Sequence, residues 1–421
     1  ENRVLKTPVR LRGRPCAPKE RSQLLHCMIR RYATNNIRMS PAEASKKAGE
    51  LFLGFKRLCR DTAPPKIDED LLTLCFAEQM QKIKLKNDMV QAEYYDLSKQ
   101  ETSSLIKGFL KQQTKKDLAP NSFLKQDKQD IKAGQGISQQ PKIVNLLVGA
   151  LVRAVEKLVK SYLKPQVLMG YGLDPVELSE HIKELRVPKN QKAVEVDVKE
   201  FDSQRGLWTD IFMDNVYEMF GVCRLRMAYM VEINRRWILS SRCMTVNVDQ
   251  HFQSGRADTL LSNTLVSMAF FGTYFDWKQI HLGLFQGDDV AVVGKEVRQV
   301  VEMGFLKTEE TFQPTFCGYF VTEKGLIIDP VAMAVKLSNR GFKDDSDLES
   351  YRLGVRDWLR TAKTGVERNR CKVIAANKYN LGSYDVGILY GFLESFARKK
   401  LFTSVRDTRL QQTNAFAVEI A

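Results

Sequence analysis

"LGLFQGDDVAVVG", residues 282–294, places two adjacent carboxylates between two apolar runs. Short apolar runs on both sides of a glycine predict two buried strands joined by a tight turn at Gly287. Because adjacent like charges repel and resist burial, Asp288 and Asp289 lower stability unless a positive group lies beside them. On its own, Gly-Asp-Asp is most often a solvated hairpin turn, since both residue types are common in turns. The pair becomes informative only if other acidic residues lie nearby.

A second acidic segment, VEVDVKEFDSQRG at 194–206, supplies candidate partners. It opens with the alternation typical of a strand, so Asp197 lies near a strand end and Asp202 lies beyond it. If this strand lies beside the hairpin, Asp197 and Asp288 converge from neighbouring strand ends. Carboxylate oxygens suit Mg²⁺ or Mn²⁺, and two such ions about 3.5 to 4 Å apart can hold both oxygens of a phosphoryl transfer. The segments together predict a divalent metal site, although each carboxylate alone is more often a strand-end or capping residue.

A polar set lies between the two acidic segments, in QSGRADTLLSNTLV at 253–266. We expect a loop leading into a helix over 259–275, with two polar side chains one turn apart on one face of that helix. This face would direct the asparagine toward the group that Asp202 faces. Taken alone, the simpler interpretation is a capped helix with a buried, hydrogen-bonded asparagine. The four candidate residues of this set are Ser254, Gly255, Thr259 and Asn263.

The composition favours a globular protein with a polyanionic partner. A chain of 421 residues with 43% hydrophobic content is large enough for two or three subdomains. The 65 Lys and Arg residues against 50 Asp and Glu give a net charge of +15, which favours nucleic acid. The 8 cysteines lack metal-ligand spacing, so we expect reduced thiols. The longest apolar run, 143–152, is shorter than the roughly 20 residues that span a bilayer, and the chain start lacks the apolar stretch of a signal peptide.

The pattern along the chain predicts helices on either side of a mixed middle region. We expect a basic arm over 1–40, helices up to about 113, and strands confined to the segment after 193. Helices return after 340. The specific elements predicted are a helix from Ser40 with Pro41 at its first position, a helix over 144–163, a strand over 193–198, the hairpin at Gly287, and a hairpin over 316–329 turning at Lys324 and Gly325.

In order, DxxxxD at 197–202, SGxxxTxxxN at 254–263 and GDD at 287–289 resemble the palm of a viral RNA-dependent RNA polymerase of positive-strand RNA viruses. LKQDKQDIKAGQGIS at 124–138 resembles the basic fingers segment of the alphavirus-like superfamily, and FCGYFVTEKGLIIDP resembles its hairpin after the palm. The resemblance covers roughly 125–337. It implies an α+β fold, a right-hand polymerase with helical fingers and thumb around an antiparallel-sheet palm. The implied domains are a basic arm and fingers over 1–192, a palm over 193–340 with a fingers insertion near 205–250, and a helical thumb over 341–421.

The resemblance also implies roles for the acidic residues. Asp197 and Asp288 would ligate two Mg²⁺ or Mn²⁺ ions, and Asp289 would be an auxiliary ligand or a partner of the primer end. Asp202 and Asn263 would bind the ribose 2′-hydroxyl of the incoming nucleotide, the group that separates RNA from DNA precursors.

Other residues would bind the rest of the nucleotide. Ser254 and Gly255 would form a mobile loop against the template, with Thr259 beside the nucleotide. Lys307 is a candidate proton donor to pyrophosphate, and a solvated lysine is an equal alternative. The triphosphate would be held by one or more of Lys125, Lys128 and Lys132, and which of them does so stays open.

The function implied is template-directed RNA synthesis from nucleoside triphosphates by a two-metal mechanism, in viral genome replication. The partners would be an RNA template and product strand, with capping and helicase domains of the same polyprotein, at membrane-associated replication complexes in the host cytoplasm. A reverse transcriptase is one alternative, although that family typically has a bulky aromatic where Asp202 and Asn263 are polar. A non-catalytic RNA-binding replicase subunit is another, since basic charge alone would suffice for binding.

Overall fold

The computed structural model describes residues 39–84, 107–113, 135–139, 142–189, 191–198, 201, 205–240, 245–249, 255–338, 342 and 344–399. Several predictions made from the sequence lie outside these residues: the basic arm up to residue 38, Lys125, Lys128, Lys132, Asp202 and Ser254.

The first half of the described chain is mainly helical, and its first helix begins as predicted. The Ser40 hydroxyl accepts a hydrogen bond from the Glu43 backbone N–H (3.3 Å), and the Glu43 carboxylate accepts one from the Ser40 N–H (2.9 Å). This reciprocal capping box satisfies N–H groups that the first turn leaves unpaired. The elements are α2 (Pro41–Lys56), α3 (Glu69–Lys84), β1 (Lys107–Gln113), β2 (Gln135–Gln139), α6 (Lys142–Tyr162), β3 (Val167–Met169) and α7 (Pro175–Glu184).

The middle region contains the predicted strand, helix and hairpin. Its elements are β4 (Ala193–Val198), α8 (Leu207–Met219), α9 (Arg224–Arg235), β5 (Arg236–Ser240), β6 (Thr245–Asp249), α10 (Thr259–Tyr274), β7 (Phe275–Asp276), β8 (Gln279–Gln286), β9 (Asp289–Lys295), β10 (Arg298–Gln299) and β11 (Leu306–Thr311). The predicted helix over 144–163, strand over 193–198 and helix over 259–275 are thereby confirmed.

The last part is a small sheet followed by helices, as expected after residue 340. Its elements are β12 (Thr315–Phe316), β13 (Tyr319–Thr322), β14 (Gly325–Ile328), α11 (Pro330–Ser338), α12 (Asp345–Leu359), the 3₁₀ turn η5 (Arg360–Ala362), α13 (Gly365–Tyr379) and α14 (Ser383–Ala397). None of the helices described here is both long and apolar enough to cross a membrane.

The expectation that strands are confined to the region after residue 193 is wrong. β1, β2 and β3 all precede it, and β1 and β2 join β5 and β6 in a separate four-stranded sheet of order β2-β1-β5-β6. The sequences of β1 and β2, KGFLKQQ and QGISQ, lack the apolar alternation that marks a half-buried strand. Their strand conformation comes from backbone pairing with distant segments, which local pattern does not register.

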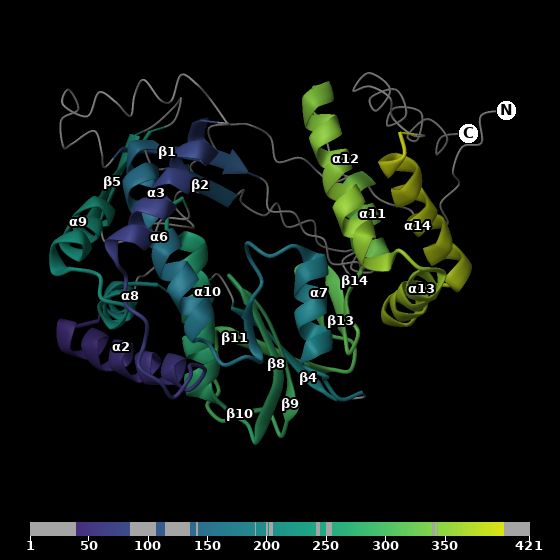
Figure 1. The fold of residues 1–421 in the computed structure, drawn as a ribbon, viewed down its shortest axis with the longest axis horizontal. Coiled ribbons are helices and arrows are strands. Elements are labelled where there is room, and N and C mark those ends of the chain that lie inside the picture. Colours follow the sequence, from purple (N-terminus) through teal and green to yellow (C-terminus); the bar gives the residue numbers. More distant parts are fainter. Residues whose placement is uncertain are drawn as a thin grey trace.

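A five-stranded sheet of order β11-β4-β9-β8-β3 lies at the centre of the molecule (Figure 1). All of its pairs are antiparallel except that of β3 with β8. Helices α2, α6, α8 and α10 lie on one side, and α11 to α14 lie on the other (Figure 1). The described chain is therefore an α+β structure with mainly antiparallel sheets, as predicted.

The sheet separates two hydrophobic cores. Side chains alternate between its faces, so Val290 and Val292 of β9 lie in the core with the N-terminal helices, while Ala291 and Val293 lie in the core with the C-terminal helices. A strand buried on both faces reads as a continuous apolar run. This explains why VAVVG follows the two carboxylates without polar interruption.

The predicted hairpin over 316–329 forms one residue earlier than expected. β13 pairs with β14 so that Thr322 faces Gly325, which makes Glu323 and Lys324 the turn. The Thr322 hydroxyl donates to the Gly325 carbonyl (2.7 Å) and accepts from the Lys324 N–H (3.2 Å). This side-chain bonding fixes the turn, and Gly325 serves as the first residue of β14 with φ +103°.

Helix α10, which carries Asn263, is positioned by a close crossing with α2. A Cβ atom added at Gly272 would lie 2.0 Å from the Gly54 carbonyl oxygen, and one at Gly54 would lie 2.8 Å from the Ala269 carbonyl oxygen. Only residues without a side chain permit this approach, since real Cβ atoms do not come so near to backbone.

Substituting Gly272→Ala should therefore force the helices apart and destabilise the protein by about 1 to 3 kcal/mol. Gly354→Ala is the matched control, because Gly354 also lies within a helix and nothing lies within 4 Å of its added Cβ. The control should gain roughly 0.5 to 1 kcal/mol from helix propensity. Melting temperatures of the two variants check this, and equal shifts would show that the crossing imposes no steric limit.

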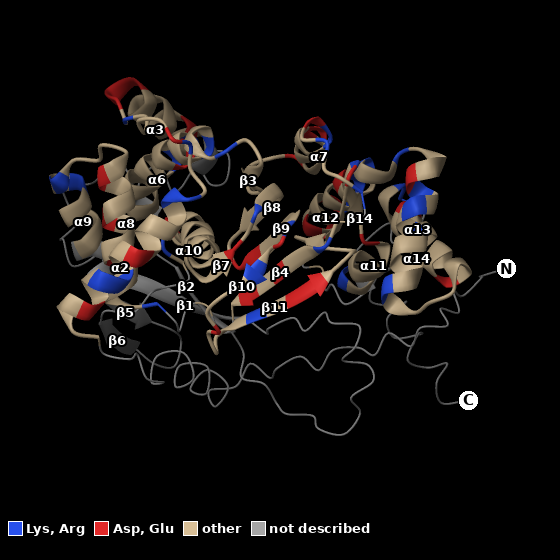
Figure 2. Ribbon diagram, turned by 90° about the horizontal axis from the view of Figure 1, so that it is seen from below, with Lys and Arg blue, Asp and Glu red and all other residues tan. Residues whose placement is uncertain are grey.

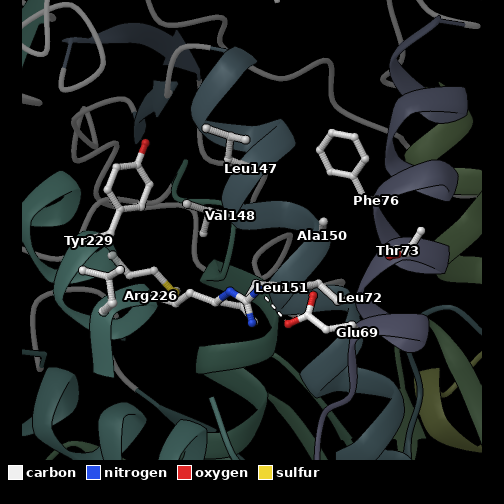
Figure 3. A pocket seen from close by; sticks show the side chains of 12 residues that line it. Glu69, Leu72, Thr73, Phe76, Leu147, Val148, Ala150, Leu151, Arg226 and Tyr229 are labelled. Atoms are coloured by element: carbon white, nitrogen blue, oxygen red, sulfur yellow. Dashed lines mark hydrogen bonds and ion pairs between the residues drawn. The ribbon is translucent and has the colours of Figure 1, made fainter. Parts of the chain in front are cut away.

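An apolar groove of about 640 Å³ lies between α3, α6 and α9 (Figure 3). Leu72, Phe76, Leu147 and Tyr229 line it, and an ion pair between Arg226 and Glu69 of 3.2 Å crosses its edge (Figure 3). None of the residues lining it is among the candidate site residues named from the sequence.

Candidate active site

The two-residue turn between β8 and β9 has the geometry that the sequence predicted. Gln286 pairs with Asp289, which leaves Gly287 and Asp288 as the turn. Gly287 has φ +62°, the positive value that a type II′ hairpin turn requires at its first central residue. The glycine is therefore needed for conformation, and both aspartates lie at the tip of the hairpin, where each residue keeps part of its surface exposed.

Helix α10 holds this turn through two hydroxyl groups. The Gly287 N–H donates to Thr264 Oγ1 (2.9 Å), and Ser267 Oγ donates to the Gly287 carbonyl (2.6 Å). Both side chains are buried, where an unmade hydrogen bond would be costly. Thr264 and Ser267 were not predicted from the sequence. Their signal was two hydroxyl residues, three positions apart, in the mainly apolar helix α10.

Asp197 lies beside the carboxylate pair, as the predicted strand pairing required. The pairing of β4 with β9 ends with Val196 opposite Val290, so Asp197 and Asp289 are the next residues on the two strands. Alternation places Asp289 on the sheet face of Ala291, and Asp197 on that of Ala193, which both border the C-terminal core. The sheet therefore brings Asp197, Asp288 and Asp289 to one edge.

The pKa of Asp289 is raised by its surroundings. The largest cause is loss of water around its carboxylate, followed by the negative charge of Asp288, and Asp197 adds to the rise. Cys317, in the turn between β12 and β13, opposes it by donating from Sγ to Asp289 Oδ2 (3.4 Å), and Lys336 opposes it through its charge. Cys317 and Lys336 were not found from the sequence, because each comes from an element beyond the three motifs.

The donor set at this edge consists of hard carboxylate oxygens, the ligands that Mg²⁺ and Mn²⁺ prefer. Asp288 and Asp197 both add to the rise in the pKa of Asp289, and a divalent cation would relieve that repulsion. Among the residues that the structure describes, no three Asp, Glu, His or Cys side chains come together as a closed metal-binding group. Asp197, Asp288 and Asp289 fit such ions because their ligand atoms are carboxylate oxygens and because the strand pairing places them close together.

Lys307 lies directly opposite Asp197 in the pairing of β11 with β4. Its Nζ is 3.7 Å from Asp197 Oδ2, and both side chains are about two-thirds exposed. Exposed ion pairs of this length contribute little stability. Figure 2 shows blue near the start of β11 and red toward its end, in agreement with its sequence LKTEET. Lys307 therefore adjoins a predicted metal ligand, which the spacing of the sequence alone did not indicate.

Asn263 is half-buried on α10, and its partner, Arg205, was not predicted from the sequence. The guanidinium of Arg205 donates to Asn263 Oδ1 from Nη1 and to Ser262 Oγ from Nη2. Thr259 is the first residue of α10, one turn before Asn263, as predicted. Gly255 lies just before this helix and is also partly buried.

A family model described as RNA dependent RNA polymerase matches residues 37–404, which include all three motifs and the elements around them. The chain belongs to this family. The resemblance to viral RNA-dependent RNA polymerases of the alphavirus-like superfamily is confirmed, and so is the enzyme class at the level of the family.

Two viral relatives agree with this membership. The methyltransferase/helicase/RNA-directed RNA polymerase of Nudaurelia capensis beta virus is 24% identical over 396 residues, 91% of this chain and 19% of that protein. The non-structural polyprotein pORF1 of hepatitis E virus genotype 1 (isolate Human/Pakistan/Sar-55) is 27% identical over 300 residues, 69% of this chain and 17% of that polyprotein. The chain thus spans less than a fifth of the length of these curated relatives.

In this member of the polymerase family, the loop before α10 is anchored by a buried arginine. Arg256 donates to both carboxylate oxygens of Asp258 (3.0 and 2.9 Å) and to Asp210 of α8 (3.2 Å). Asp258 is 1% exposed, so the paired charges offset each other's loss of hydration. Arg256 therefore joins the loop that carries Gly255 to α8.

Asp214 of α8 lies within the same charged group and makes stability depend on pH. Burial, together with the neighbouring Asp210, raises the pKa of Asp214 from 3.8 to about 6, although Arg256 opposes the rise. The folded protein then binds more protons than the unfolded chain between these values, so stability falls as pH rises from about 4 to 6.

Asp214→Asn removes this ionisation, and we expect it to be more stable than the parent by about 1 kcal/mol at pH 8, a value reduced because the carboxyl is partly exposed. The advantage should shrink toward pH 4, where the Asp214 carboxyl of the parent is neutral. Unfolding measured from pH 4 to pH 8 checks the sign. A difference independent of pH would mean that Asp214 is charged throughout.

Proposed function

We propose that this chain catalyses template-directed RNA synthesis in the replication of a viral genome. The observation that carries the proposal is the meeting of Asp197 with the Gly287–Asp289 turn at one edge of the central sheet, in a member of the polymerase family. The substrates would be nucleoside triphosphates, an RNA template and a growing RNA strand.

The proposed architecture is a right hand. The helices and four-stranded sheet on one side would be fingers (1–192, with an insertion near 205–250), the central sheet the palm (193–340), and α12 to α14 the thumb (341–421). The pairing of β5 with β1, and of β6 with β5, supports an insertion that belongs with the N-terminal part. The pairing of β3 with β8 adds one earlier strand to the central sheet.

The reaction would be in-line attack of a 3′-hydroxyl on the α-phosphate of a nucleoside triphosphate, with pyrophosphate leaving. Asp197 and Asp288 would hold two Mg²⁺ or Mn²⁺ ions with Asp289 as an auxiliary ligand, and the bound ions would lower the hydroxyl's pKa and neutralise charge on the transferring group. The turn geometry set by Gly287, Thr264 and Ser267 fixes where those carboxylates lie. The protein would thus contribute by positioning the reacting groups and by supplying the carboxylates that hold the ions.

Basic residues would bind and protonate the leaving group. Lys307 is assigned as the proton donor to pyrophosphate, because its ammonium group lies at the carboxylate edge beside Asp197. Lys125, Lys128 and Lys132 are assigned to the triphosphate, on the resemblance alone. Ser254, Gly255 and Thr259 are assigned to the template and nucleotide side of the site.

Asn263 and Asp202 would bind the ribose 2′-hydroxyl. Asn263→Ala should therefore lower discrimination between ATP and dATP by roughly tenfold, since an unmade buried hydrogen bond costs about 1 to 3 kcal/mol. Incorporation of both nucleotides, together with a melting curve, checks this. If Asn263 is only a packing residue, the ratio stays unchanged while the melting temperature falls.

The larger assembly is also part of the proposal. One relative is named methyltransferase/helicase/RNA-directed RNA polymerase, which supports capping and helicase domains as partners of this chain in one polyprotein. Work at membrane-associated replication complexes in the host cytoplasm is proposed from the resemblance.

The deciding experiment compares four reactions: ribonucleotides or deoxynucleotides, each with an RNA or a DNA template, in the presence of Mg²⁺. We expect products with ribonucleotides on RNA. Products with deoxynucleotides would favour a reverse transcriptase. Tight RNA binding without any product, at every Mg²⁺ or Mn²⁺ concentration tried, would favour a non-catalytic RNA-binding subunit.

A further inference from the structure

Arg205 is a buried cation placed between the first acidic motif and α10. It lies three residues after Asp202 and is only 2% exposed. Its two terminal nitrogens donate to Asn263 and Ser262, adjacent residues on α10, and its guanidinium carbon lies 5.7 Å from the centre of the Phe201 ring. The side chain therefore joins the segment after β4 to the predicted ribose-binding face of α10.

Burying an arginine lowers stability, because the guanidinium loses its hydration, and an apolar side chain of similar volume often stabilises a core equally well. What arginine offers instead is a planar, rigid set of hydrogen-bond donors. Such a set fixes the orientation of an acceptor more tightly than an apolar contact does. The contacts of Arg205 thus favour a role in orienting Asn263 over a role in packing alone.

The bond to Arg205 decides which atoms Asn263 offers to a substrate. An asparagine amide has one acceptor oxygen and two N–H donors. Because Arg205 donates to Oδ1, the oxygen side of the amide faces the guanidinium and the Nδ2 donors remain for other partners. A ribose 2′-hydroxyl accepts as well as donates hydrogen bonds, so it fits these donors.

We propose that Arg205 is a positioning residue for sugar selection: it holds the Asn263 amide so that Nδ2 donates to the 2′-hydroxyl of the incoming ribonucleotide. This rests on the proposed function, and specifically on the ribose role of Asn263. Arg205 itself touches no substrate in this scheme. It acts by fixing which end of the amide the nucleotide meets.

Three variants test this through the ratio of kcat/KM for ATP to that for dATP. Asn263→Asp keeps an acceptor for Arg205 and nearly the same shape but has no Nδ2 donors, so the ratio should fall roughly tenfold. Arg205→Met removes the orienting donors, and the ratio should fall by a similar factor. Arg205→Lys keeps charge without the planar donor set, so it should give an intermediate ratio.

Arg352→Met is the matched control. Arg352 is likewise 2% exposed, donates to the Phe396 carbonyl (3.0 Å) and to Glu349 (2.8 Å), and lies on α12. The control should lower the melting temperature without changing the ratio. The double variant Arg205→Met with Asn263→Ala should lose no more selectivity than Asn263→Ala alone, because the two residues act through one hydrogen bond to the sugar.

The outcomes separate the inference from the proposed function. If Asn263→Ala lowers the ratio but Arg205→Met does not, the positioning role is overturned and the ribose role of Asn263 stands. If Asn263→Ala leaves the ratio unchanged, the ribose role itself fails, and the inference fails with it. Should Arg205→Met not fold, Asn263→Asp still decides: an unchanged ratio in that variant overturns the donor role of Nδ2.

Discussion

Asp288→Asn is expected to lower the rate of nucleotide addition by at least about a hundredfold, while the melting temperature and RNA affinity stay close to those of the parent. Loss of a residue that only supports a metal ligand already costs roughly 10- to 100-fold, and Asp288 is assigned as a ligand itself. The side chain lies in an exposed turn, so the fold does not depend on its burial. Single-nucleotide addition to an RNA primer on an RNA template measures the effect.

Asp276→Asn is the control for this experiment. Asp276 is also an exposed aspartate at a strand end, and its 3.5 Å ion pair joins it to Arg57, the residue just after α2, and not to the carboxylate edge. It should retain the parent rate. Comparable rates for Asp288→Asn and the parent would remove the metal assignment, whatever the control does.

Gly287→Val is expected to reduce nucleotide addition by roughly a hundredfold, because displacement of catalytic groups by about 1 Å can cost that much. Gly287 has φ +62°, a conformation that β-branched residues strongly resist, whereas the nearest atom to an added Cβ, on Leu260, is 3.6 Å away. The strain is therefore conformational and not a clash.

Two companion variants separate these causes. Asparagine adopts positive φ more readily than other residues, so Gly287→Asn should keep much more activity than Gly287→Val. Gly304→Val should behave as the parent, since Gly304 has nothing within 4 Å of an added Cβ and no positive φ. Equal losses for valine and asparagine at Gly287 would contradict the role assigned to its backbone conformation.

The sequence predicted those features that depend on neighbouring residues. The hairpin at Gly287 follows from a glycine and an acidic residue between two apolar runs, and the start of α2 follows from Ser40, Pro41 and Glu43. The position of Asp197 beside the hairpin needed only one assumption, that β4 pairs with β9. These local patterns predicted three of the five strands of the central sheet, namely β4, β8 and β9.

Features made by contacts between distant segments were not predictable in this way. Arg205 reaches Asn263 across 58 positions, and Cys317 reaches Asp289 across 28, so no periodicity records either contact. β1 and β2 are strands through pairing and not through their own pattern. The hairpin of β13 and β14 was misplaced by one residue, because the bonds of the Thr322 hydroxyl fix its turn.

Template-directed synthesis is measured by single-nucleotide addition with the purified chain on RNA templates that differ only in the first templating base. With Mg²⁺ present, we expect the added ribonucleotide to change with that base, and addition to stop when the metal is chelated. Tight binding of the same RNA, with no nucleotide added or with addition that ignores the templating base, would contradict this expectation.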